Sequence, residues 1–87
     1  MDFEFDENKS ILNAGKHGID FITAQHLWSD DRRLIVSARS QDETRFAIIA
    51  MHQGKLWTAI YTLREDRIRI ISARRSRHGE EEGYHHS

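Results

Sequence analysis

The fold is decided by residues 61–75, which read Tyr-Thr-Leu-Arg-Glu-Asp-Arg-Ile-Arg-Ile-Ile-Ser-Ala-Arg-Arg. We interpret this stretch as a β-strand, a tight polar turn at Glu65 and Asp66, and a second strand in which arginine alternates with isoleucine. Because successive side chains of a strand point to opposite faces, Ile68 and Ile70 can be buried while the neighbouring arginines stand on the other face. A face with several guanidinium groups is suited to an anion, and phosphate is the first candidate.

A second hairpin precedes this one and gives an expected register. A strand, a turn and a returning strand are predicted over residues 45–51, 52–55 and 56–63. If both turns have two residues, Thr62 faces Arg45 on one neighbouring strand and Arg69 on the other. We call the four arginines that share this face the arginine row: Arg45, Arg64, Arg67 and Arg69. The same face is expected to continue through Ala47, Ile49, Thr58, Ile60, Ile71 and Ala73. The opposite face is the expected core: Phe46, Ile48, Trp57, Ala59, Tyr61, Leu63, Ile68 and Ile70.

Two helices are expected before the sheet, because Asp6 and Asp20 are typical N-cap residues and Gly18 is typical of a helix C-terminus. The first helix covers residues 7–16, and its apolar side is expected to be Ile11, Leu12 and Ala14. In the second helix Phe21, Ala24, Leu27 and Trp28 recur at helical spacing and are expected in the core.

The remaining segments are shorter. Phe3 and Phe5 alternate with acidic residues, which allows a short edge strand. Residues 34–36 are a strand candidate and residues 37–43 a polar loop, while the glycines around residues 80–82 predict a short or frayed last helix. The fold class is therefore α+β, with two N-terminal helices packed on a three- or four-stranded antiparallel sheet.

Composition narrows the class of protein. The chain has 87 residues, which predicts a single domain over residues 1–87. It has no cysteine, which excludes disulfides and thiolate zinc sites and fits a reducing compartment. We find no apolar run of ~18 residues and no basic region before one at the start, so we expect neither a membrane span nor a signal peptide, and a cytoplasmic location.

Charge is unevenly distributed along the chain. The net charge is −1, which argues against nonspecific binding of nucleic acid, yet six arginines lie between residues 64 and 77 against only Glu65 and Asp66. Like charges on facing strands repel unless an anion lies among them. Glu43, Glu65 and the acidic tail can supply that anion, which gives a salt-bridged surface. An RNA backbone can supply it as well, and composition leaves both interpretations open.

Five segments together resemble the BrnT family of toxins over nearly the whole chain: residues 3–9, 16–21, 43–46, 61–64 and 68–75. The most specific are Lys-His-Gly at residues 16–18 and Ile-Arg-Ile-Ile-Ser-Ala-Arg-Arg at residues 68–75. The resemblance implies a RelE-like α+β fold and a ribonuclease that blocks translation. It also implies a BrnA-type antitoxin with a ribbon-helix-helix domain, a hetero-oligomer built on a toxin dimer, and repression of their operon, with operator DNA contacted only through the antitoxin. The tail departs from the family's basic helix, although Tyr84 matches a family tyrosine.

The residues also define a candidate site. RNA cleavage without metal needs a base, an acid and cations for the phosphorane. We expect Arg45, Arg64 and Arg69 to contact the phosphate, with a hydrogen bond from Thr62. The resemblance adds His17 from the Lys-His-Gly segment, although a histidine there can also serve a helix C-terminus. Further RNA contacts are expected from Arg67, Arg74, Arg75 and Arg77, of which the last three can instead pair with an acidic antitoxin.

No cofactor or metal is expected. The tail histidines, His78, His85 and His86, are the only metal candidates, and adjacent histidines share one ion poorly. Two other functions stay open beside the ribonuclease toxin. One is a catalytically inactive toxin-like module that survives as the partner of a DNA-binding antitoxin in operon autorepression. The other is a plain RNA-binding domain.

Overall fold

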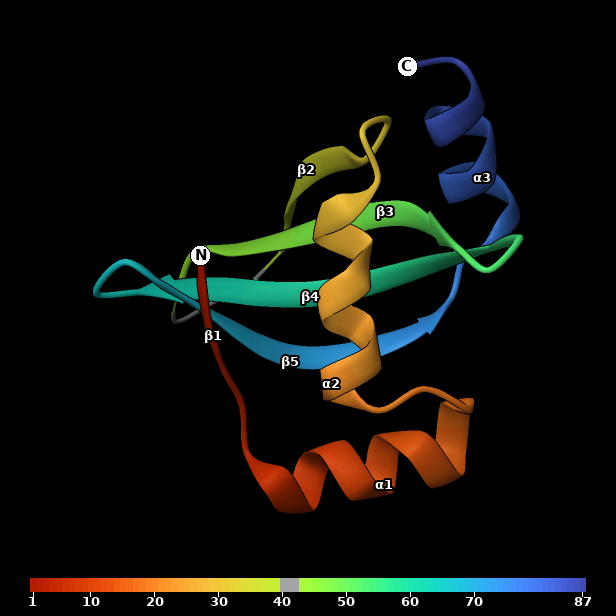
Figure 1. Ribbon diagram of the computed structural model, residues 1–87. Helices are drawn as coiled ribbons and strands as arrows, with labels where there is room; N and C mark the ends of the chain where they lie inside the picture. The colour runs from red at the N-terminus through yellow and green to blue at the C-terminus, as the bar shows by residue number, and fades with distance from the viewer. Residues whose placement is uncertain (40–42) are drawn as a thin grey trace.

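The computed structural model describes residues 1–39 and 43–87, and Figure 1 shows how the elements are arranged. The elements, in chain order, are β1 (Asp2–Glu4), α1 (Glu7–His17), α2 (Phe21–Ala24), the 3-10 helix η1 (Gln25–Ser29), β2 (Leu34–Ala38), β3 (Arg45–His52), β4 (Lys55–Arg64), β5 (Arg67–Arg75) and α3 (His78–His85). The predicted α+β class is confirmed. Strand β2 includes part of the predicted loop, whose residues 40–42 lie outside the described residues.

The strands form one sheet in the order β1-β5-β4-β3-β2. Four strands are antiparallel, and β1 pairs parallel to β5 with Phe3 beside Ile68. The prediction of a purely antiparallel sheet of three or four strands is therefore wrong in strand number and in the direction of β1. The short edge strand is held by its side chain, because the Phe3 ring packs edge-on against Trp28 with 5.0 Å between centroids.

Both predicted two-residue turns are confirmed. His52 pairs with Lys55, and Arg64 pairs with Arg67. The turn residues all have positive φ: 51° at Gln53, 78° at Gly54, 47° at Glu65 and 70° at Asp66. Positive φ at both positions is typical of the turn whose twist matches that of a hairpin. The turns therefore place Thr62 opposite Arg69, as the sequence predicts.

A β-bulge corrects the predicted faces of β5. Tyr61 pairs with Ile70 and Ile60 pairs with Ser72, which leaves Ile71 as the extra residue. The alternation of side chains restarts after the bulge, so Ala73 lies buried in the core and not on the arginine face. Leu63 was also assigned wrongly: it is 58% exposed, because it lies at the hairpin end, where it is not part of the buried core beneath the helices.

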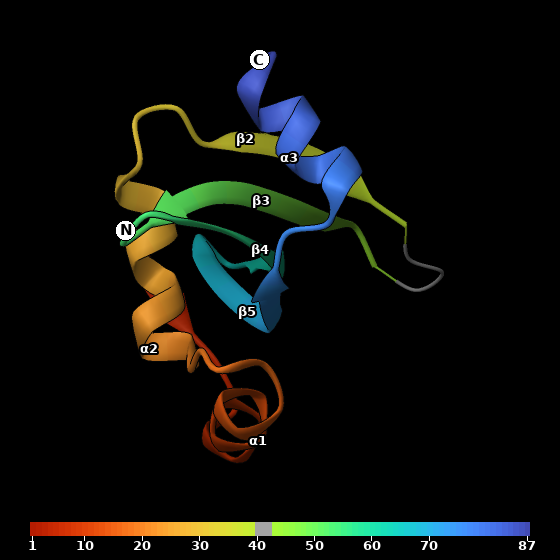
Figure 2. The ribbon, with the colours of Figure 1, turned by 90° about the vertical axis from the view of Figure 1, so that its right-hand side faces the viewer.

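Helices cover the sheet on both sides. Segments α2 and η1 lie on one face, α1 lies along the β5 side of the sheet (Figure 1), and Figure 2 shows α3 on the other side of β3. The main core lies under α2 and η1, and Trp28, Phe46 and Trp57 border it. The buried core residues are Ile19, Phe21, Ala24, Leu27, Ile48, Ala50, Ala59, Tyr61, Ile68, Ile70 and Ala73. A second, smaller cluster of Leu34, Ile49, Leu56 and Tyr84 lies under α3.

The predicted buried side of α1 is wrong. Ile11 and Leu12 are exposed, whereas Ser10 and Asn13 are buried. Asn13 Nδ2 donates to the carbonyls of Ile19 and Ala73, each at 2.8 Å, and Ser10 Oγ accepts from the Phe21 N–H at 2.9 Å. A buried polar group costs little when it is bonded in this way, so the polar face of α1 seals the helix to the rest of the molecule.

The predicted helix ends are confirmed. Asp6 accepts from the Lys9 N–H at 3.1 Å, Asp20 accepts from the Thr23 N–H at 2.7 Å, and Gly18 ends α1 with φ of 78°. The last helix is short, as predicted, and it is anchored by the buried side chain of Tyr84. Within the described residues no helix has both the length and the apolar character that a membrane crossing requires.

Candidate nucleic-acid interface

The arginine row lies at the end of the sheet where β4 turns into β5. Cross-strand pairing brings Arg64 opposite Arg67, and Arg69 follows two residues later on the same face. A cavity of 300 Å³ opens there, lined by Glu4, Arg64, Glu65 and Arg67. The structure thus brings these arginines together beside an open volume, at the place that the register predicts.

Two arginines of the row already have a carboxylate partner. Arg69 Nη1 lies 2.9 Å from Glu4 Oε2, and Arg45 Nε lies 3.2 Å from Glu43 Oε1. Within the described part of the chain, Arg64 and Arg67 make no ion pair within 4.0 Å. The cations at the hairpin end are therefore available to an external anion, and those deeper in the sheet are partly neutralised.

Glu4 is a site residue that the sequence analysis missed. The parallel pairing of β1 places Glu4 beside Arg69, which nothing in the local sequence indicates. The alternation of Phe3, Glu4 and Phe5 predicts that this segment is an edge strand, but it does not predict which strand lies beside it.

Thr62 lies between the arginines as predicted, but it is only 4% exposed. Its hydroxyl donates to the Thr44 carbonyl at 2.7 Å. The hydroxyl is therefore engaged in holding the segment before β3 against the sheet.

The three C-terminal arginines have three different environments. Arg74 forms two hydrogen bonds to Glu80, at 2.7 and 2.9 Å, and Thr58 Oγ1 donates to the same carboxylate at 3.0 Å. The bonds from Arg74 hold the pKa of Glu80 at about 2, well below its ordinary value. Arg77 is exposed at the start of α3, and Arg75 lies on the opposite face of the sheet, over the Trp57 ring. Arg74 is thus a link between β5 and α3.

His17 does not join the arginine row. It is the last residue of α1 and lines a cavity of 490 Å³ on the face of the sheet that α2 covers. The cavity is lined by His17, Gly18, Ile19, Thr23, His52, Gln53, Lys55, Trp57 and Arg75. Arg75 lies six residues beyond Arg69, or roughly 20 Å along the strand. His17 and Arg75 therefore lie at the opposite end and on the opposite face of the sheet from the arginine row.

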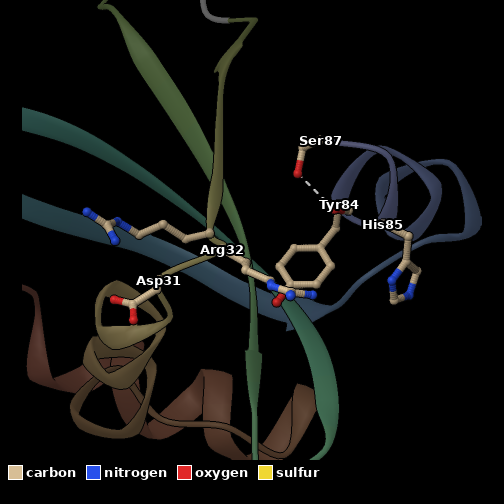
Figure 3. Close-up of a pocket in the computed structure, with 6 residues that line it drawn as sticks. Asp31, Arg32, Tyr84, His85 and Ser87 are labelled. Carbon is tan, nitrogen blue, oxygen red and sulfur yellow. Dashed lines mark hydrogen bonds between the residues drawn. The ribbon is translucent and has the colours of Figure 1, made fainter.

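A third cavity, of 690 Å³, lies between α3 and the loop before β2, where Arg32 lies beside Tyr84 (Figure 3). The Tyr84 hydroxyl donates to Asp30 Oδ2 at 2.6 Å, and the Met51 N–H donates to the same oxygen at 2.8 Å. Desolvation acts to raise the pKa of Asp30, but these bonds outweigh it and hold that pKa below its usual value. The bond to Asp30 raises the pKa of Tyr84. Tyr84 therefore fastens α3 to the body of the protein.

The described residues hold no cluster of three or more histidine, aspartate or glutamate side chains with the arrangement of a metal site. The tail histidines in particular do not converge with one another or with a carboxylate set, and His78 pairs with Glu82 one helical turn away.

Comparison with known proteins gives one positive result. A search of curated proteins found no significant match. The family model described as "Ribonuclease toxin, BrnT, of type II toxin-antitoxin system" matches residues 5–80. The match spans α1, every strand of the sheet except β1, and the start of α3, so it includes all of the site residues that the sequence predicts. The chain belongs to the BrnT family of ribonuclease toxins of type II toxin–antitoxin systems.

Proposed function

We propose that this chain, as a single domain over residues 1–87, is a metal-independent endoribonuclease that cleaves cellular RNA and inhibits translation. The observation that carries the proposal is the pair Arg64 and Arg67, which border the 300 Å³ cavity and make no ion pair within the described residues. Two unpaired guanidinium groups on facing strands repel each other, and a bound phosphate removes that cost.

The arrangement supports cleavage by the neighbouring 2′-hydroxyl. The hydroxyl oxygen attacks the phosphorus, a base takes its proton, and the 5′-oxygen leaves with a proton from an acid. Arg64 and Arg69, with Arg45 and Arg67 beside them, stabilise the charge that gathers on the phosphoryl oxygens. Glu4 contacts Arg69 and lines this cavity, and we propose it as the proton acceptor.

The partner follows from the family. A type II toxin has a protein antitoxin, and we propose a BrnA-type protein whose ribbon-helix-helix domain contacts operator DNA. The toxin acts in the cytoplasm, and the repressing complex is a hetero-oligomer that contains a toxin dimer.

Induced expression of the chain alone in bacteria tests the activity. We expect growth arrest with RNA cleavage, and loss of both in Arg64→Ala and in Arg69→Ala at unchanged protein level. Lys9→Ala, a change at an exposed residue of α1 that lines neither cavity, is the control and keeps toxicity. Full toxicity of both arginine variants would reject the arginine row as the site.

A second function has one observation in its favour. Arg45, Arg69 and Arg74 are each paired with a glutamate, as expected of a surface neutralised from within. An inactive toxin-like partner of the antitoxin would have such a surface. It predicts normal growth on expression of the folded wild-type chain, with operator binding only when both proteins are present.

A further inference from the structure

We propose that the cavity lined by His17, His52, Lys55, Trp57 and Arg75, here called the basic pocket, binds a phosphate of the substrate RNA at a second contact apart from the arginine row. This inference rests on the proposed ribonuclease function, and it assigns a binding role to residues that belong to neither the arginine row nor α3.

Four elements build the basic pocket. His17 comes from the end of α1, where Gly18 turns the chain with φ of 78°. His52 and Lys55 are the paired residues that flank the β3–β4 turn. Trp57 and Arg75 are paired across β4 and β5. Residues from distant parts of the sequence thus converge on one volume of 490 Å³, within the size range of small-ligand sites.

The charge of the basic pocket is one-sided. Its lining includes two basic side chains, Lys55 and Arg75, and two histidines, and no carboxylate. Neither Lys55 nor Arg75 makes an ion pair within 4.0 Å in the described residues. The cavity at the arginine row differs, since Glu4 and Glu65 line it together with its arginines. An uncompensated cationic concavity attracts an anion more strongly than a mixed one.

The ring of Trp57 orients the guanidinium group of Arg75. The guanidinium carbon of Arg75 lies 5.5 Å from the centroid of the Trp57 ring, and Arg75 Nε donates to the Leu56 carbonyl at 3.3 Å. These two contacts fix the guanidinium plane and use one of its five N–H groups. Its Nη groups make no hydrogen bond within the described residues, so the planar fork is left to bind two phosphate oxygens.

The histidine side of the pocket is also held in place. The His52 ring stacks on His26, with 5.0 Å between centroids and 14° between planes. Basic groups beside aromatic planes are typical of single-stranded RNA sites, where the groups follow the backbone and a base can stack on a ring or a guanidinium plane. This combination favours RNA over an acidic protein segment, which needs only the charges.

Binding can be separated from cleavage with a single-stranded oligoribonucleotide of twelve 2′-O-methyl nucleotides, because the methyl group removes the attacking hydroxyl. Its affinity is measured by fluorescence anisotropy at two salt concentrations. We expect Lys55→Ala and Arg75→Ala each to weaken binding about fivefold and to lower the salt slope by about one contact. Lys9→Ala changes affinity less than twofold. Arg75→Lys, which keeps the charge, falls between wild type and Arg75→Ala.

Each outcome decides between the two sites. Unchanged RNA affinity in the folded Lys55→Ala/Arg75→Ala double variant, with affinity lost in Arg64→Ala, overturns the basic pocket and leaves the proposed function standing. Weakened binding of a BrnA-type antitoxin in the double variant, with RNA affinity unchanged, overturns it in favour of a protein site. If wild-type protein does not bind the oligonucleotide at all, both proposals fail. Lys55 is an exposed residue at the start of β4, so its variant tests binding even if Arg75→Ala is destabilised.

Discussion

At both ends of β5, an arginine that is paired with a glutamate lies close to one that, in the described part of the chain, is not. At its start, Arg69 is bound by Glu4 at 2.9 Å, and near its end Arg74 is bound twice by Glu80. Arg75, the next residue, points to the other face and rests on Trp57 without a carboxylate. Arginine count alone therefore does not locate an anion site. The presence or absence of a carboxylate in contact with each guanidinium does, and that depends on strand direction and on a bulge.

The largest effect is expected at the unpaired end of the row. Arg64→Ala removes a guanidinium that no described residue neutralises, and we expect RNA cleavage to fall at least about 100-fold, as when a transition-state contact is removed. Because Arg64 is exposed, the fold remains intact. The measurement is single-turnover cleavage by purified protein, with circular dichroism for folding.

Arg64→Lys sharpens this test, because it keeps the charge and loses the bidentate fork. Intermediate activity would assign the effect to geometry as well as to charge. Cleavage by Arg64→Ala at the wild-type rate would instead place the chemistry elsewhere, and the basic pocket would be the first place to examine.

The ion pair between Arg74 and Glu80 is expected to support the stability of the fold and not RNA binding. The pKa of Glu80 is held at about 2, so its contribution is fully present above the ordinary value of 4.5 and is lost as pH falls from 4.5 towards 2. We expect Glu80→Gln to cost about 2 kcal/mol at pH 7, after allowance for partial exposure. The difference from wild type should shrink as pH falls through that window.

Urea unfolding of wild type, Glu80→Gln and Glu81→Gln between pH 7 and pH 3 measures this effect. Glu81 lies on the same helix without an ion pair in the described residues, so its variant controls for charge alone. Asp20 and Asp30 also have lowered pKa values and add a background of the same sign, which the difference between variants removes. A constant difference at all pH values would contradict the assignment.

A smaller effect is expected where a carboxylate competes with RNA. Glu4→Gln frees Arg69 and removes a negative charge from the cavity, so we expect about threefold tighter binding of the 2′-O-methyl oligonucleotide. Glu7→Gln removes an equal charge from the first turn of α1 and should change little. Cleavage gives a second readout: loss of cleavage with tighter binding would identify Glu4 as the proton acceptor. Weaker binding would contradict the view that Glu4 neutralises the row.

The sequence predicted the features that depend on local rules. Two-residue turns set the register of both hairpins, and the caps at Asp6, Asp20 and Gly18 set the ends of the helices. Hydrophobic periodicity failed at α1, because Asn13 is buried by hydrogen bonds to residues up to 60 positions away. The periodicity argument uses only the polarity of each side chain and takes no account of the carbonyl groups to which a buried polar side chain can donate.

The candidate site was predicted only in part, for a similar reason. Arg64, Arg67 and Arg69 share a face because alternation and turn length fix it. The bulge at Ile71, opposite Ile60 and Tyr61, adds one residue to β5, which is why Arg75 and not Arg74 reaches the face covered by α2, beside His17. A bulge leaves no clear mark in a run such as Ile70-Ile71-Ser72, where either neighbour can fill the core. The pairing of Glu4 with Arg69 depends on the direction of β1, which local sequence does not encode.

The smallest effect is expected from chelation. The proposed cleavage uses cations in the arginine row, a second phosphate contact in the basic pocket, and proton transfer by groups near the phosphate. We therefore expect EDTA to leave the cleavage rate within about twofold of that in its absence, since no step needs a metal-bound water. The assay uses purified protein and a 2′-hydroxyl RNA, with the non-cleavable 2′-O-methyl strand as the control for binding. The contrary outcome is a loss of cleavage in EDTA that added Mg²⁺ or Mn²⁺ restores, while affinity for the control strand is unchanged. In that case the arginines would only hold the RNA, and the comparison between the paired and unpaired arginines of β5 would concern binding alone.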